Sequence, residues 1–597
     1  MPRQPPTPTR LLPAPTASPV PPTPTPLPPT ATSTLAPMGE VQEYTNGYEY
    51  LGDPDEMALG FNMRAGGAIG SLLWHGIELV DDTDFGRYVQ VSPYDGDDVY
   101  IGGGGVPYGE FGWNPLQAGG MGGGGNAYAG TVLDFRRFDG GMYVKTLAKE
   151  WGAPDDKDSD TIYEVWAFLR EGYFEVYVRA THVGDVYHAL GLVEDPSVYF
   201  EFALRDEYAY LGDAPFTAAP MEKLHNNSIP GEVAGDPSCP GIVPTENWAA
   251  FARGDQTGLI LATPLQKYLS LDWALCLIYD SPPVGYISSV GFWDFAPGDT
   301  REVHFYLIPG DIAEGRKIVY DLLPHTQWTF DLDTLEGWHG AAATVTDGIA
   351  TVEFSPAQPF VSQPGLWING RVMPALTLTG RAVEWELPVC LEYLPIDRSD
   401  WVSDPALCQT IPAGDFAPYT FDGSALPSWR DARITQLRLT SPDSGRLEID
   451  SLAVQKTGQM LDFAVEDELL SLGTINQLEN IQVAQGILQM TSTGDDPYFD
   501  IPLQTPVLAD STPRVEIRMR VSSGGGGQVF FTPETGTISE ATSLWFELIP
   551  DGEFHTYTLD FSSLPDWTGT ISKMRLDPTD APGDVEIDYI LIASPRP

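Results

Sequence analysis

The chain has 597 residues, of which 42% are hydrophobic and 11% aromatic, which is enough for about three packed domains. Its formal net charge of −51 gives a surface that repels phosphate backbones and anionic lipid, so we expect no nucleic-acid partner. No stretch of about 20 apolar residues occurs, so we expect no membrane insertion. Neutral or cationic partners and divalent cations suit this charge, and plain solubility is the simpler explanation.

Residues 1–38 consist almost entirely of Pro, Thr, Ala, Ser and Leu. Because such a segment cannot bury a core, it predicts a disordered, extended linker of the polyproline type. Linkers of this kind hold domains away from a cell surface, so we expect a tether here; a leader that tethers nothing is the alternative. No signal peptide is visible in the first residues, and we expect one upstream of this start.

Residues 39–325, the N-terminal lobe, contain short runs of β-formers such as DTIYEVWAFL and YFEVYVRATHV, which predict a large β-sandwich domain. Gly-rich breaks at 101–109 and 118–126 lack the spacing of nucleotide-binding loops, so we expect surface loops there. The convincing helical stretch of this region is 313–323.

The rest of the chain contains nearly the same unit twice. The segment with Trp429 and Asp450 recurs 138 residues later around Trp567 and Asp588. Solenoid repeats are about 20–50 residues long, so a longer duplicated unit predicts a pair of domains, each a two-sheet sandwich of short strands. We refer to them as module 1 (residues 326–457) and module 2 (residues 458–597).

The four cysteines fall into two pairs, each inside one predicted domain: Cys239 with Cys276, and Cys390 with Cys408. No CxxC or Cys/His spacing of a zinc site occurs among them, so disulfides or free thiols are expected. A small even number of cysteines fits an oxidising compartment.

Several pieces of the modules carry a resemblance: WHGAAATVTDGIATVEF, YTFDGSALPSW with ITQLRL and GRLEID, and YTLDFSSLPDW with MRLDPTDAPGDVEIDYILI. Both modules resemble jelly-roll carbohydrate-binding modules of the galactose-binding-like kind, found in secreted polysaccharide-degrading enzymes. The resemblance implies a polysaccharide or glycan partner and a location outside the cell or on its surface. Module 1 departs from the pattern by an insert around Cys390–Cys408, and module 2 by LLSLGT in place of Trp-Gly.

The N-terminal lobe opens with RAGGAIGSLLWHGIELVDDTDFGRYVQVSPYDG and continues with WNPLQAG, which resembles uncharacterised secreted β-proteins. This resemblance implies a supersandwich of the galactose-mutarotase type. The fold class expected for the whole chain is therefore all-β, with a large β-sandwich followed by two jelly-roll modules and preceded by the linker.

The densest polar cluster of the lobe lies between residues 75 and 117. Sugar hydroxyls bond to carboxylates, Arg and Asn, and a pyranose ring stacks on Trp or Tyr. Two carboxylates can hydrolyse a glycosidic bond, and a His with Tyr or Arg can abstract a proton beside a uronate. The alternative is a polar turn in which Arg87 pairs with a carboxylate. The predicted catalytic residues are His75, Asp84, Arg87 and Glu110, and the predicted sugar-binding residues are Tyr94, Trp113 and Asn114.

Further aromatic candidates for sugar binding lie outside that cluster. PTENWAAF contributes Trp248, which we expect to bind sugar. In the modules some tryptophans must be core residues, because a sandwich buries a large aromatic. The candidates are Trp338, Trp367, Trp429, Trp545 and Trp567, of which we expect Trp367 and Trp429 to bind sugar.

Calcium is the cofactor that the sequence suggests, and we expect no organic one. Asp156, Asp158 and Asp160 alternate in DDKDSD, a spacing that suits calcium although it is not an EF-hand. A solvated acidic turn is the alternative. Asp588 can contribute to a second site with Glu586, because alternate residues share a strand face.

Three functions remain open from the sequence. The lobe can be an enzyme that cleaves glycosidic bonds by hydrolysis or elimination while the modules hold the polysaccharide. The whole chain can instead be a non-catalytic glycan-binding or adhesion protein. A structural surface-layer or filament subunit is the third possibility.

Overall fold

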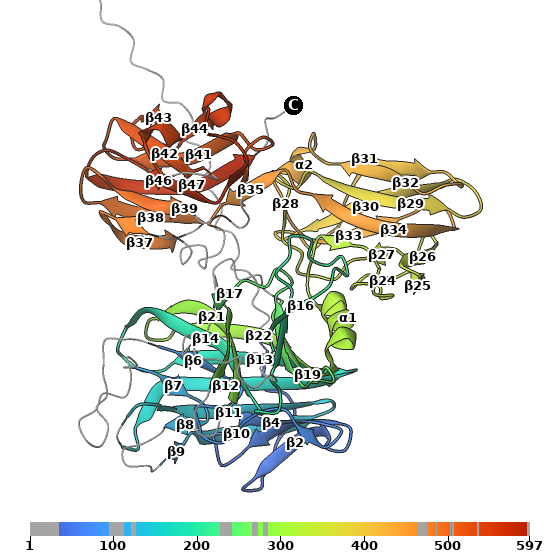
Figure 1. Ribbon diagram of the computed structural model, residues 1–597, viewed down its shortest axis with the longest axis vertical. Coiled ribbons are helices and arrows are strands. Elements are labelled where there is room, and N and C mark those ends of the chain that lie inside the picture. Colours follow the sequence, from blue (N-terminus) through green and yellow to red (C-terminus); the bar gives the residue numbers. More distant parts are fainter. Residues whose placement is uncertain are drawn as a thin grey trace, which may run out of the picture. The chain divides into compact units, whose positions relative to one another are not determined.

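The computed structural model describes residues 35–94, 113–120, 127–153, 155–226, 241–264, 273–278, 284–463, 472, 474–484, 486–501, 503, 507–533 and 537–593. Almost all regular structure in these residues is antiparallel β-sheet, so the all-β prediction is confirmed (Figure 1). The helical segments are α1 (Ile312–Leu322), α2 (Pro427–Arg430), η2 (Glu540–Thr542) and η3 (Phe561–Ser563).

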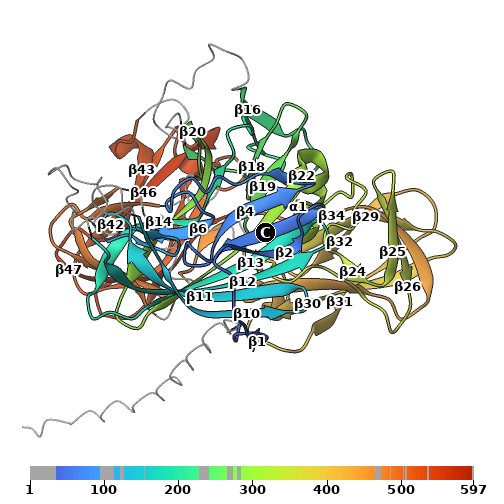
Figure 2. The ribbon, with the colours of Figure 1, turned by 90° about the horizontal axis from the view of Figure 1, so that it is seen from below.

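The main sheet of the N-terminal lobe follows the order β1-β10-β11-β12-β13-β22-β19-β18-β15-β16, with β7 paired to β11. Figure 2 shows β10, β11, β12 and β13 side by side. Burial alternates residue by residue along β13, as expected for a strand with one face on a core. The strands are β1 (Glu40–Val41), β7 (Pro115–Leu116), β10 (Thr131–Phe138), β11 (Gly141–Glu150), β12 (Asp158–Arg170), β13 (Tyr173–His182), β15 (Asp206–Ala209), β16 (Glu222–Asn226), β18 (Trp248–Ala252), β19 (Thr257–Ala262) and β22 (Thr300–Asp311).

Two further sheets of the lobe share a hydrophobic core with the main sheet. Phe61 of β3, Val193 of β14 and Val165 of β12 belong to the same buried cluster, so the sheets are packed face to face. One sheet has the order β17 (Gly241–Ile242), β20 (Trp273–Ile278), β21 (Val284–Phe295), β14 (His188–Phe200), β6 (Gln90–Pro93). The other has the order β2 (Tyr48–Asp53), β3 (Met57–Asn62), β4 (Ala68–Trp74), β5 (Ile77–Glu78), and a short pair joins β8 (Gly119–Gly120) to β9 (Tyr128–Ala129).

The helix α1 confirms the helical stretch predicted near the end of the lobe. Asp311 caps it, because its carboxylate accepts hydrogen bonds from the backbone N–H groups of Ala313 and Glu314. The helix buries one face against β18, β19 and β22, and that face includes Arg316 and Tyr320.

Module 1 is a sandwich of two antiparallel sheets, coloured from green-yellow to orange in Figure 1. The first sheet has the order β25 (Ala342–Thr346), β26 (Ile349–Phe354), β34 (Gly445–Gln455), β29 (Ala375–Ala382), β32 (Ala417–Asp422), with β23 (Gln327–Trp328) paired to β34. The second has the order β24 (His339–Gly340), β27 (Phe360–Val361), β33 (Arg433–Thr440), β30 (Leu387–Pro395), β31 (Val402–Ile411), with β28 (Ile368–Asn369) paired to β33.

Module 2 has the same strand order, so the repeat in the sequence is also a repeat in topology. Its first sheet is β37 (Leu478–Ala484), β38 (Ile487–Ser492), β47 (Gly583–Ala593), β41 (Arg514–Val521), β44 (His555–Asp560), with β35 (Gly458–Leu461) paired to β47. Its second is β36 (Ile475–Asn476), β39 (Tyr498–Ile501), β46 (Lys573–Asp577), β42 (Gly526–Thr532), β43 (Ser543–Glu547), and a short pair joins β40 (Val507–Leu508) to β45 (Thr570–Ile571).

Trp429 and Trp567 have the same role in the two module cores. Each indole N–H donates to a backbone carbonyl, that of Met373 in module 1 at 3.0 Å and that of Ala509 in module 2 at 2.9 Å. Each ring also meets an aromatic ring edge to face, at 4.9 Å for Tyr393 and Trp429 and at 4.8 Å for the second pair, Phe531 and Trp567. The repeated tryptophan is therefore a core residue in both copies.

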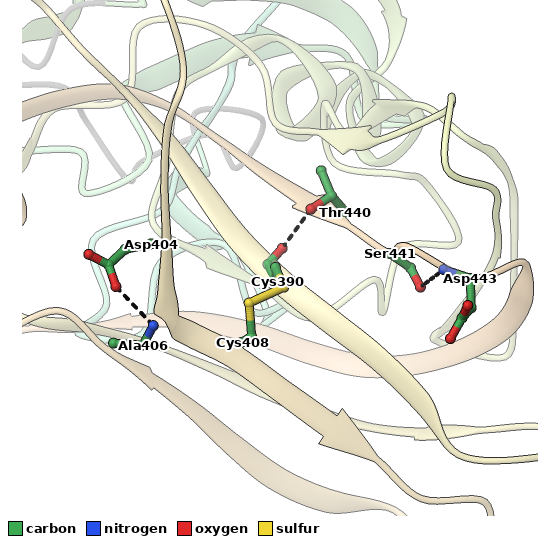
Figure 3. The surroundings of a disulfide bond; sticks show 7 residues. All are labelled: Cys390, Asp404, Ala406, Cys408, Thr440, Ser441 and Asp443. Carbon is green, nitrogen blue, oxygen red and sulfur yellow. Dashed lines mark hydrogen bonds between the residues drawn. A yellow bond between two sulfur atoms is a disulfide. The ribbon is translucent and has the colours of Figure 1, made fainter.

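Cys390 and Cys408, for which the sequence left a disulfide or two free thiols open, form a disulfide that joins β30 to β31 (Figure 3). Thr440 of the neighbouring strand β33 donates a hydrogen bond to the Cys390 carbonyl. The predicted pair of Cys239 and Cys276 falls on side chains outside the described part of the chain. No helix among the described residues is long and apolar enough to cross a membrane.

Candidate functional site

Module 2 carries an open pocket of about 420 Å³ on its second sheet. This volume is in the range of small-molecule sites, which measure about 300–1,000 Å³. Strands β42, β43 and β46 form its floor, and the loops before β39, before η2 and after β46 form its rim. The lining residues are Asp495, Asp496, Pro497, Gly526, Gly527, Gln528, Phe530, Ile538, Ser539, Glu540, Trp545, Arg575, Asp577, Thr579 and Asp580.

Trp545 gives this pocket an exposed aromatic surface. Its side chain points out of β43 and is 60% exposed, an unusual position for so large an apolar group. Gly526 on β42 makes room for it, because a Cβ atom there would lie 2.1 Å from the indole Nε1. The indole therefore packs against bare backbone and leaves a broad ring surface open to a ligand.

The polar groups of the pocket are held in place by one another. Arg575 donates from Nε and Nη2 to the two carboxylate oxygens of Asp577, both at 2.6 Å, and Nη2 also reaches Asp496 at 3.2 Å. The Arg575 guanidinium lies 3.5 Å from the ring centroid of Tyr498, a stacked cation–π contact. Gln528 donates to Glu540 at 2.9 Å. A guanidinium group held in one orientation in this way is pre-organised to bind a ligand.

The pocket is acidic. Five carboxylates and one guanidinium are among its lining side chains. Burial raises the pKa of Asp577, although Arg575 beside it favours the charged form. Anionic ligands are disfavoured by such a lining, whereas hydroxyl groups find many acceptors.

Module 1 has a different surface at the equivalent position. In module 2, Gln528 pairs with Trp545 on one side and with Asp577 on the other. In module 1 the corresponding register joins Cys390 to Cys408 and to Thr440. The disulfide thus occupies the place of the Gln528–Trp545 pair, and module 1 lacks the exposed indole there.

The arginine of the pocket does have a counterpart in module 1. Arg438 follows the same repeat register as Arg575, forms an ion pair with Glu392 and lies 4.4 Å from the Trp401 ring centroid. The two copies therefore share an arginine stacked on an aromatic ring and differ in what lies beside it.

The N-terminal lobe holds a second polar cluster, formed by Glu194, Tyr94, Tyr199 and Tyr286. Tyr286 and Tyr94 both hydrogen-bond to the Glu194 carboxylate. Burial raises the pKa of Glu194 in spite of these bonds. The pKa of Tyr199 is raised by burial and by the charge of Glu194, with a smaller contribution from Asp84. A carboxyl group whose pKa is raised in this way is suited to donate a proton.

Three of the residues predicted for a sugar site lie at this Glu194 cluster. Tyr94 is one of its members, and Asp84 and Arg87 lie close enough to influence Tyr199 electrostatically. Asp84 and Arg87 also pair with each other at 3.2 Å, which is the polar-turn alternative noted for them. His75 lies apart on the exposed turn between β4 and β5, and Glu110 is outside the described residues.

Most of the predicted sugar-stacking residues are buried. Trp113 stacks on His188, and the Asn114 amide donates to Ser92 Oγ and the Pro93 carbonyl inside the lobe. Trp248 and Trp429 are fully buried and have no exposed ring surface to offer a sugar. Trp367 is half-buried, with Arg433 5.2 Å from its ring centroid.

No protein-family model and no curated protein sequence matches this chain. Similar solved structures include a galactose mutarotase related enzyme from Lactobacillus acidophilus (11% identity, 44% of this chain and 97% of that chain, TM-score 0.26). They also include the tandem CBM22 domain of Xyn10C from Paenibacillus barcinonensis (15% identity, 46% and 97%, TM-score 0.19) and the CBM6 of LamC from Zobellia galactanivorans (14% identity, 23% and 99%, TM-score 0.17). Both kinds of fold that the sequence resembles are thus among the similar structures. The function of this chain must be inferred from its own residues.

The carboxylates predicted to bind calcium have other partners. Asp156 and Asp158 both accept from the Lys149 ammonium, at 2.5 and 2.6 Å. Asp588 is paired with Arg518 of the neighbouring strand β41. Asp160 lies instead beside two histidines.

The sequence contains a pattern that indicates the pocket of module 2, although Trp367 and Trp429 were predicted as the sugar-binding residues. Gly524–Gly527 run directly into β42, and glycines in a strand often mark a place where another group approaches the backbone closely. The partner that approaches is Trp545, and only the register of β42 and β43 identifies it.

Proposed function

We propose that the chain is a glycan-binding protein and that the pocket of module 2 holds a neutral sugar against Trp545. The exposed indole beside Arg575, Gln528 and several carboxylates carries this proposal, because a sugar offers an apolar ring face to the indole and hydroxyls to the polar groups. The acidic lining favours a neutral glycan over one with carboxylate or sulfate groups.

The rest of the chain fits a role outside the cell. The Pro/Thr-rich linker would tether the lobe and modules to a surface, and the glycan would be an extracellular polysaccharide. Because the disulfide takes the place of the indole in module 1, we assign glycan binding to module 2 and not to both copies.

Trp545→Ala should weaken binding of the full chain to its glycan by about 30-fold or more, which corresponds to the 2 kcal/mol or more typical of a binding hot spot. A screen of neutral and acidic polysaccharides identifies the ligand, and calorimetry with an oligosaccharide of that polymer measures the affinity. Gly526→Ala should act in the same direction, because its Cβ would displace the indole.

Trp385→Ala is the matched control, since Trp385 is 56% exposed but lies on the turn between β29 and β30 of module 1. It should bind like the wild type. Equal affinity of Trp545→Ala and the wild type, or preference for acidic polysaccharides, would refute the proposed site.

The Glu194 cluster favours a second function, cleavage of the bound glycan by the lobe. A carboxyl group that has a raised pKa and is hydrogen-bonded to tyrosines is suited to general acid catalysis. We expect the wild type to release reducing ends or unsaturated products, and Glu194→Gln to lower that rate about 10²–10⁴-fold. Binding of the polysaccharide by this variant should equal that of the wild type, because Glu194 lies in the lobe and not in the pocket of module 2. Product release by Glu194→Gln at the wild-type rate would eliminate this function.

A further inference from the structure

Asp160, His182 and His188 come together from three consecutive strands of the lobe. Asp160 lies near the start of β12, His182 ends β13 and His188 begins β14. The Asp160 Oδ2 atom is 3.1 Å from His182 Nε2 and 3.0 Å from His188 Nε2, and the three atoms all lie within 4.8 Å of one another. Three potential metal-ligand atoms therefore lie close enough together to reach one ion.

His182 has an unmet bonding requirement. Its side chain is buried, with 1% of the residue exposed, and neither ring nitrogen makes a hydrogen bond within the described part of the chain. The contact of Nε2 with Asp160 is short but does not have the geometry of a hydrogen bond. A buried polar group left without a partner destabilises the fold, so a ligand that accepts the Nε2 lone pair would be stabilising.

Neighbouring residues fix the orientation of this group. The Trp113 indole stacks on the His188 ring, with centroids 3.8 Å apart, and its N–H donates to Asp160 Oδ1 at 2.8 Å. That bond leaves Oδ2 directed at the histidines. A Cβ atom on Gly184 would lie 2.6 Å from Oδ2, so the adjacent position has room only for glycine. Outer partners of this kind orient ligands in metal sites.

We propose that Asp160, His182 and His188 bind one divalent transition metal ion of the zinc class. Two imidazole nitrogens and one carboxylate oxygen suit such ions, whereas calcium takes oxygen ligands. Zinc–ligand bonds of about 2.0–2.1 Å in a tetrahedral site place ligand atoms roughly 3.3 Å apart, close to the observed distances. Three protein ligands leave a coordination position for water or another ligand.

The protonation states are compatible with this assignment. Burial lowers the pKa of His182, which favours the neutral imidazole that a metal needs. Burial opposes the charged form of Asp160, but hydrogen bonds from His188 and Trp113 hold the pKa of that carboxyl below its usual value.

Zinc binding to the untagged, EDTA-treated full chain is the test. We expect calorimetry and metal analysis to find one tight Zn²⁺ per chain, and Co²⁺ to give the visible absorption of a low-coordinate site. His182→Ala should weaken Zn²⁺ binding by more than about 100-fold, and Trp113→Phe, which removes only the outer hydrogen bond, by about 10–100-fold. Ca²⁺ should not compete.

His555→Ala is the matched control, because His555 also lies 2.9 Å from a carboxylate oxygen, that of Asp551, but belongs to no three-ligand group among the residues that the structure describes. It should bind Zn²⁺ like the wild type. Circular dichroism shows whether each variant remains folded. If His182→Ala does not fold, the zinc affinity of Trp113→Phe still tests the proposal. Absence of a tight site in the wild type, or equal zinc affinity in the wild type, His182→Ala and Trp113→Phe, would overturn it.

Discussion

Replacing Glu246 with alanine is expected to lower the free energy of unfolding of the N-terminal lobe by about 3–5 kcal/mol. Glu246 is fully buried, and its carboxylate is paired with the Arg316 guanidinium through Nε at 2.9 Å and Nη2 at 2.7 Å. Alanine would leave this arginine buried without its counter-charge. It would also remove the acceptor used by the Trp248 indole, the Tyr320 hydroxyl and the Phe216 backbone N–H.

Arg316→Met in the Glu246→Ala background is the control for this interpretation. If most of the cost is the unpaired charge, the double variant should be at least as stable as Glu246→Ala alone. The chain has several hydrophobic cores that can unfold separately. The stability of the lobe is therefore measured by hydrogen exchange of peptides from α1 and β18. A decrease in the free energy of unfolding below about 1 kcal/mol for Glu246→Ala would contradict the role assigned to the pair. So would costs of Glu246→Ala and Arg316→Met that simply add in the double variant.

Trp429→Ala is expected to destabilise module 1 by about 3–5 kcal/mol. The ring fills the core between Tyr393 and the backbone of Gly370 and Gly423, where added Cβ atoms would lie 3.0 Å from the ring Cδ1 and 2.4 Å from the ring Cγ. Alanine leaves a cavity and removes the donor to the Met373 carbonyl. Hydrogen exchange of β29 and β33 as a function of urea concentration measures the loss in this module.

Trp367→Ala is the matched control in the same module. Trp367 is half-buried and makes a cation–π contact with Arg433, which contributes about 0.5–1 kcal/mol at an exposed position. A similar loss of stability for the two variants would mean that Trp429 has no special place in the core. Glycan binding by module 2 should be unchanged in both.

The sequence predicted the parts of the fold that depend on local pattern and repetition. Alternating β-formers predicted the strands, the segment 313–323 predicted α1, and the recurrence of Trp429 as Trp567 predicted two modules of one topology. The proximity of Cys390 and Cys408 in the chain suggested that they pair, and the structure decides between a disulfide and free thiols. Each of these features is visible within a short window or by comparison of the chain with itself.

The functional residues depended on contacts between distant segments. Trp248 looked like a sugar-binding residue, but its indole is bonded to Glu246, and Arg316, which completes that buried group, comes from α1. Asp160 was grouped with its acidic neighbours, yet pairing of β12 with β13 brings it to His182. Composition cannot show which aromatic or acidic residues face inward, because strand register decides it.

The two modules illustrate how a duplicated fold can diverge at one surface. The cores keep the same tryptophan with an aromatic partner at the equivalent position, Tyr393 or Phe531. The outward pair at the pocket is Gln528 and Trp545 in one copy and a disulfide in the other. Packing restricts which residues can occupy the core positions, whereas the outward positions of the same strands are free to change and to bind ligands. Glycan recognition is therefore expected in one copy without any change of fold in the other.

Diffraction from crystals of the full chain with its bound oligosaccharide tests glycan recognition most directly. We predict a sugar ring stacked on Trp545, with hydroxyls hydrogen-bonded to Arg575 or Gln528 and to carboxylates of the same pocket. A sugar bound elsewhere, with the Trp545 ring left uncovered, would contradict the assignment of this pocket.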